Sequence, residues 1–176
     1  ITFTPAANYA GTVSFAYTVS DGKGGTNSAA VSGTITNVND TPVAQDDTTA
    51  LNGNEDTTSA VLNTTLLSND TDADGDTLTI TSVGFRTLTP GTAQTITVAN
   101  GTVNVDSAGS ITFTPTANYV GPVSFAYTIS DGNGGTNSGT ASGIIQAVND
   151  TPVAVDDLTA LNGNEDTTSA VLNTTL

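Results

Sequence analysis

The stretch Val123-Ser-Phe-Ala-Tyr-Thr-Ile-Ser130 decides the fold class of this chain. Its large apolar side chains fall at every second position, so in an extended strand they share one face, with small and polar residues on the other. Asp131-Gly-Asn-Gly-Gly135 then predicts a tight turn, and a last strand is expected over residues 137–148. The pattern indicates antiparallel β-structure with one buried face.

Outward from this stretch, other short runs alternate in the same way and are separated by Gly, Asn, Asp and Pro. They are residues 77–83, 94–98, 102–105 and 111–114, and two or three weaker strands are expected within Val43–Leu67. No window shows helical apolar spacing over three turns. Seven or eight short strands indicate an all-β fold, a two-sheet antiparallel sandwich.

The alternation also predicts which side chains form the core of the sandwich. They are Leu78, Ile80, Val83, Ile96, Val98, Val103, Val105, Ile111, Phe113, Val123, Phe125, Tyr127 and Ile129. Tyr119 stands just before the Phe125 strand, where sandwiches often place a corner tyrosine.

The whole pattern repeats at an offset of 110 residues. Ile1–Pro5 recurs as Ile111–Pro115, and 53 of the 66 comparable positions are identical. This offset is the size of a small domain, not the roughly 20–50-residue period of a solenoid. We predict tandem modules of 110 residues: the end of one repeat at 1–40, a complete repeat at 41–150 and the start of the next at 151–176. The chain is then a window onto a longer array.

The charge of the chain limits its partners. It has 17 acidic residues, two basic ones (Lys23 and Arg86) and a net charge of −15. Without a basic surface we expect no nucleic-acid partner, and without a long apolar run no membrane insertion in this segment. Cations are the natural partner, although acidic residues also simply keep a repetitive surface protein soluble.

Composition argues against catalysis. The chain has no His and no Cys, which excludes Ser–His and Cys–His nucleophiles and transition-metal sites of the His/Cys type. Its acidic residues lie in polar turns, where a raised pKa of the kind a catalytic carboxyl needs is not expected. We predict that the protein is not an enzyme.

The remaining chemistry is the binding of a hard cation by oxygen ligands. In an extended Asn69–Asp76 the alternate acids point to one side, so Asp70, Asp72, Asp74 and Asp76 are expected to converge. The flanking helices and the Glu at position 12 of an EF-hand are missing. The full set of candidate calcium ligands is Asn39, Asp40, Glu55, Asp70, Asp72, Asp74, Asp76, Asp131, Asn149, Asp150 and Glu165. A solvated acidic turn and a turn-rich linker are the competing interpretations.

The order of these motifs resembles the cadherin fold, and is most similar to the cadherin-like tandem repeats of very large bacterial surface adhesins. The motifs are an Asn-Asp-x-Pro linker at 39–42, Asn-Glu-Asp at 54–56, Asp-x-Asp at 72–74 and Ser-Asp-Gly at 130–132. The resemblance implies a seven-strand, Greek-key, immunoglobulin-like sandwich, calcium at the junctions between repeats and an extracellular rod on the bacterial surface. The family usually adds an acid pair from the preceding domain, but Ile1–Val13 contains no acid.

These observations predict a calcium-stiffened spacer of an adhesin, with calcium ions and neighbouring repeats of the same chain as partners. Glu55, Asp72, Asp74 and Asp131 are expected to approach the Asn39–Asp40 junction from the following module. Two other classes stay open. One is a self-assembling filament or matrix protein in which identical chains pair laterally, and the other is a carbohydrate- or protein-binding repeat.

Overall fold

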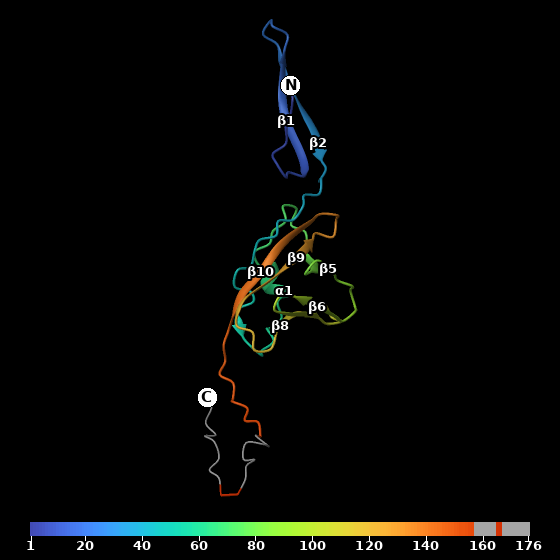
Figure 1. Ribbon diagram of the computed structural model, residues 1–176. Coiled ribbons are helices and arrows are strands. Elements are labelled where there is room, and N and C mark those ends of the chain that lie inside the picture. The colour runs from blue at the N-terminus through green and yellow to red at the C-terminus, as the bar shows by residue number, and fades with distance from the viewer. Residues whose placement is uncertain (157–164, 167–176) are drawn as a thin grey trace.

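The computed structural model describes residues 1–156 together with 165 and 166, and its strands form a separate hairpin and a two-sheet body (Figure 1). The hairpin consists of β1 (Gly11–Ser20) and β2 (Thr26–Ile35), paired antiparallel. The body, which we call the sandwich, spans residues 42–148. The only helix among the described residues is α1 (Asn63–Leu67), which is far too short to cross a bilayer.

The two sheets of the sandwich are built from eight strands. The first sheet has the order β3 (Gly53–Asn54), β10 (Thr136–Gln146), β9 (Gly121–Ser130), β4 (Thr79–Val83) and β5 (Arg86–Thr87). The second sheet has the order β6 (Gln94–Val98), β7 (Gly101–Val105) and β8 (Ile111–Pro115). The chain therefore changes sheet after β5 and returns after β8, which confirms the expected all-β sandwich.

The core lies between the two sheets, where alternate side chains of facing strands meet. Ten of the thirteen predicted core residues are buried, and the other three, Leu78, Ile80 and Val98, are half-buried at its margin. The Phe113 ring from β8 and the Phe125 ring from β9 lie 6.2 Å apart and join the sheets. The period-2 pattern therefore identified the buried face correctly.

The prediction of two or three strands within Val43–Leu67 is wrong in part. This segment forms only β3 and two isolated bridges, one between Val43 and Thr71 and one between Asp47 and β10. It then crosses to β8, where Leu62 N donates to the Ile111 carbonyl at 2.8 Å. The chain then coils into α1, because one helical turn places Leu62 and Leu66, four residues apart, on the same buried side. Leu51 is also buried, and none of these three leucines was predicted as core.

Tyr119 is a corner tyrosine, as predicted. Its hydroxyl donates to the Pro122 carbonyl at 2.7 Å, and Tyr9 of the hairpin donates in the same way to the Thr12 carbonyl at 2.6 Å. The conformation at the start of β9 is therefore repeated at the start of β1.

Burial differs sharply between the hairpin and its counterpart in the sandwich. Phe125 and Tyr127 of β9 are 4% and 0% exposed, whereas the equivalent Phe15 and Tyr17 of β1 are 36% and 39% exposed. The sequences are nearly the same, so contact with a second sheet makes the difference. The division of the chain into three repeats stays a prediction.

Candidate metal centre

Three segments bring oxygen atoms together at the end of the sandwich where the linker from the hairpin enters (Figure 1). They are the linker at residues 39–40, the loop at residues 72–76 and the β9–β10 turn that begins at Asp131. We call these residues the entry cluster. The segments are far apart in sequence, so the fold assembles the cluster.

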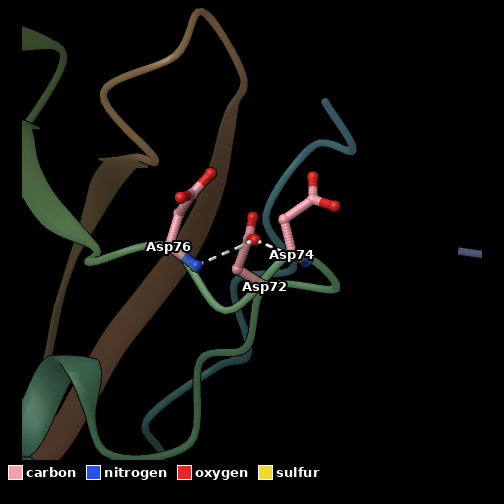
Figure 2. Close-up of side chains that lie close together, drawn as sticks. All are labelled: Asp72, Asp74 and Asp76. Atoms are coloured by element: carbon pink, nitrogen blue, oxygen red, sulfur yellow. Dashed lines mark hydrogen bonds between the residues drawn. The ribbon is translucent and has the colours of Figure 1, made fainter. Parts of the chain in front are cut away.

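The loop holds three carboxylates close together. One Asp72 oxygen, Oδ1, accepts hydrogen bonds from Asp74 N at 2.9 Å and Asp76 N at 3.2 Å, and Gly75 supplies the positive φ that closes the loop. Asp72, Asp74 and Asp76 each present a carboxylate oxygen, and these oxygens lie within 4.8 Å of one another. Figure 2 shows the three side chains rising from this loop. At these separations they repel one another unless a cation lies between them.

The linker is bound to the body of the sandwich at this point. Asp40 N donates to Asp74 Oδ2 at 2.7 Å, and Asn39 Nδ2 donates to Asp131 Oδ2 at 2.8 Å. Asn39 Nδ2 also reaches the Asp40 carbonyl at 3.1 Å. The linker, the loop and the turn therefore form one hydrogen-bonded unit.

Asp131 is buried and ionised in this unit. The hydrogen bond from Asn39 lowers the pKa of Asp131 most, and the backbone N–H groups of Asn133 and Gly135 lower it further. Asn133 also donates through Nδ2 to Asp76 Oδ2 at 2.7 Å, so it ties the turn to the loop. The sequence analysis did not identify Asn133 as a site residue, although its position in the Asp131–Gly135 turn could have indicated this role.

One carboxylate oxygen of the cluster lacks a partner. Asp72 Oδ2 is buried and accepts no hydrogen bond, and the other such side-chain atom among the described residues is Asn69 Oδ1. A buried acceptor without a donor is costly, and here the neighbouring side chains are further carboxylates. A hard cation satisfies such an oxygen, and carboxylate, amide and carbonyl oxygens are its preferred ligands. The residues of the entry cluster therefore fit calcium.

Asp70 does not join this cluster, which corrects the expectation that four carboxylates converge. Thr71 pairs with Val43 through two backbone hydrogen bonds of 2.7 and 3.0 Å, and this bridge fixes the chain before the loop turns. Asp70 Oδ1 instead accepts from Gln45 N at 2.8 Å and lies 3.4 Å from the Tyr127 hydroxyl. It belongs to the flank of the sandwich.

Asp70 is part of a second polar group, around Tyr127, that sequence analysis did not identify. The buried Tyr127 hydroxyl lies 2.9 Å from Asp47 Oδ2 and 3.0 Å from the Leu66 carbonyl. Burial raises the pKa of Asp47, and the nearby charges of Asp70 and Asp46 raise it further. Tyr127 had been predicted only as a core residue, because the alternation gives its face but not what its hydroxyl meets.

Glu55 lies at the opposite end of the sandwich, so the prediction that it approaches the Asn39–Asp40 junction is wrong. Glu55 is buried, and its Oε1 accepts from Val148 N at 2.8 Å. Its backbone is held there because β3 pairs with the last two residues of β10. Since β10 has 11 residues, about 34 Å of strand separates this end from the entry cluster.

The second linker repeats the conformation of the first. Asn149 Nδ2 donates to the Asp150 carbonyl at 3.1 Å, as Asn39 does to the Asp40 carbonyl. Asn149 and Asp150 are exposed, and Val148, the residue just before them, donates to Glu55. Glu165 is exposed in a turn, and its neighbour Asn164 lies outside the described residues.

Comparison with known proteins places the chain in a family. The cadherin-like domain family matches residues 1–36 and 38–146, most of the chain. No curated protein and no solved structure matches significantly. The family indicates an adhesion-type or extracellular repeat, typically non-enzymatic, that generally binds calcium and neighbouring domains. The chain belongs to the cadherin-like domain family.

Proposed function

We propose that this chain is a calcium-stiffened extender of a large extracellular bacterial adhesin or surface-matrix protein, acting in cell adhesion and biofilm formation. The observation that carries the proposal is the buried, unpartnered Asp72 Oδ2 among the carboxylates of the entry cluster. It is supported by the sandwich itself, in which the linker enters at one end and the chain leaves at the other (Figure 1).

The entry cluster couples the linker to the sandwich. Asp40 N and Asn39 Nδ2 already bond to Asp74 and Asp131. A bound calcium ion supplies positive charge between the converging carboxylates. Asp72, Asp74, Asp76 and Asp131 would hold it from the body, and the oxygens of Asn39 and Asp40 would hold it from the linker. The linker then has one preferred direction, and successive repeats extend as a stiff rod.

The end of the sandwich from which the chain leaves also carries oxygen atoms that could bind a cation. Glu55 lies beside Val148, just before the Asn149–Asp150 linker, and each complete repeat would present this set to the entry cluster of the next. We propose Glu55, Asn149 and Asp150 as ligands at the junction that follows this repeat. Glu165, the equivalent of Glu55 in the following repeat, would be a ligand at the next junction.

A calcium titration by isothermal calorimetry tests the proposal. Extracellular calcium modules bind with dissociation constants of roughly 10⁻⁴–10⁻³ M, so saturable heat is expected in the millimolar range. Asp74→Ala should abolish the strongest phase, because it removes both a carboxylate ligand and the acceptor for Asp40 N. If the unmodified chain shows no saturable calcium binding below about 10 mM, well above that range, the proposal is wrong.

A further inference from the structure

The outer edge of the first sheet is closed by a segment that runs parallel to its neighbour. Residues 46–55, which we call the edge segment, lie along β10, and Asp47 forms a parallel bridge with Ala141. At its far end β3 pairs in parallel with Ile145 and Gln146. The edge segment and β10 therefore point in the same direction along the sandwich.

Backbone hydrogen bonds join the edge segment to β10 over most of its length. Four of them involve residues outside β3: Asp47 N to the Thr140 carbonyl at 2.9 Å, Ser142 N to the Asp47 carbonyl at 2.9 Å, Leu51 N to the Ser142 carbonyl at 3.2 Å and Glu55 N to the Gln146 carbonyl at 2.9 Å. They are spread from the start of the segment to its end.

Three side chains of the edge segment provide acceptors where its backbone does not. Thr140 N donates to Asp46 Oδ1 at 2.8 Å, Ile144 N to Asn52 Oδ1 at 2.9 Å and Val148 N to Glu55 Oε1 at 2.8 Å. Irregular backbone would otherwise leave these N–H groups without a protein partner. The contact thus contains these seven hydrogen bonds, three of them made by side chains, in addition to the pairing of β3 with β10.

The edge segment also packs tightly against glycines of β10. A Cβ at Gly143 would collide with the carbonyl carbon of Leu51. A Cβ at Gly139 would lie 3.1 Å from the carbonyl oxygen of Gln45, the residue just before the edge segment. Leu51 itself is 2% exposed and belongs to the core. Sliding of the segment along β10 would therefore disturb core packing as well as hydrogen bonds.

A force applied to the two ends of the chain would act along this contact. The linker enters at the end near Asp131, and the chain leaves at the opposite end after β10 (Figure 1). Tension on the chain therefore pulls the edge segment one way and β10 the other, along their common axis. In this shear geometry all the hydrogen bonds of the contact share the force, whereas in a hairpin opened from its ends they would break one at a time.

We propose that the edge segment is the force-bearing contact of the sandwich, and that under tension the sandwich unfolds only when this segment is sheared from β10. This goes beyond the calcium-stiffened spacer, because it concerns the strength of the folded unit and needs no bound cation.

The test is the unfolding rate of the whole chain at constant force, tethered through its two ends. In Asn52→Ala, Ile144 N loses its acceptor, and the rate of the step that releases the sandwich should rise about five-fold, the effect of one ordinary hydrogen bond. Asn63→Ala is the matched control. Asn63 Oδ1 accepts from Ile111 N at 2.8 Å, away from the edge segment, so that contact stays intact when the segment detaches.

Three outcomes decide the proposal. It is supported if Asn52→Ala unfolds faster under force, Asn52→Asp restores the original rate by restoring the acceptor, and Asn63→Ala changes only stability measured in denaturant. The same ranking is expected in calcium and in chelator, so loss of calcium binding would sink the spacer proposal and leave this one standing. Equal forced-unfolding rates for the original chain and Asn52→Ala, or an equal acceleration in Asn63→Ala, would overturn it.

Discussion

Asp72→Asn should have opposite effects on stability with and without calcium. The amide oxygen of the variant can replace Oδ1 and accept from Asp74 N and Asp76 N, so the loop keeps its conformation. Its NH₂ group would replace the unpartnered Oδ2 and put a donor among carboxylates. In chelator the variant should therefore be at least as stable as the original chain, and in calcium it should be less stable.

The size of each effect follows from the geometry. At the 4.8 Å limit of the carboxylate cluster, one like-charge pair repels by roughly 1 kcal/mol in water and about 3 kcal/mol at an effective dielectric constant of 20. The gain in chelator should be nearer the lower value, because the three residues are only half-buried. In calcium at about 100 times the dissociation constant, one site stabilises the fold by about 2.7 kcal/mol, which raises the melting temperature by roughly 10 °C.

The assay is thermal unfolding followed by circular dichroism in chelator and in calcium. Asp106→Asn is the matched control, because Asp106 Oδ1 also accepts from the N–H groups two and four residues on, at 2.9 and 2.8 Å, in a turn outside the cluster. The control should keep the full calcium shift and Asp72→Asn should lose most of it. Equal calcium shifts in the two variants would refute the assignment of Asp72.

Three further predictions concern the sandwich itself. Burial raises the pKa of Asp47 above its ordinary value of 3.8, so the stability of the fold should decrease as pH rises through the raised pKa. Asp47→Asn should remove this decrease and give a higher melting temperature at pH 7. A lower melting temperature of the variant at pH 7 would contradict the reasoning. Tyr119→Phe loses the hydrogen bond to the Pro122 carbonyl and should cost about 1 kcal/mol in urea unfolding, whereas Tyr9→Phe in the hairpin should leave the sandwich unchanged. Gly143→Ala should cost about 3 kcal/mol in the same assay because its Cβ meets the Leu51 backbone, while Gly33→Ala, whose Cβ meets nothing within 4 Å, should cost the sandwich nothing.

The sandwich could be predicted from sequence because its main strands bury one face. Alternation at positions such as Phe125 and Tyr127 reports that face directly. Val43–Leu67 could not be read in this way, because it contacts β10, β8 and the core in turn instead of one sheet throughout. Leu62 and Leu66 are buried by a single helical turn only because hydrogen bonds to β8 fix the position at which this segment crosses between the sheets.

The candidate site was predictable where its ligands are close in sequence. Asp72, Asp74 and Asp76 come from one loop, and Asp131 lies in a turn that the sequence marks clearly. Glu55 was assigned to the wrong end of the sandwich. The spacing of the motifs gives their order along the chain but does not show at which end of the sandwich each one lies. Only the parallel pairing of β3 with the end of β10 shows that Glu55 lies beside Val148.

The central claim is that calcium stiffens the junction between repeats, and small-angle X-ray scattering of a chain with several complete repeats tests it most directly. In millimolar calcium the scattering should be that of a stiff rod whose maximum dimension grows evenly with repeat number. In chelator the carboxylates around Asn39–Asp40 repel, so the same chain should become flexible, and high monovalent salt should restore stiffness only in part because it screens charge without bridging the linker. An unchanged maximum dimension and unchanged flexibility between calcium and chelator would contradict the claim and favour lateral assembly or ligand binding.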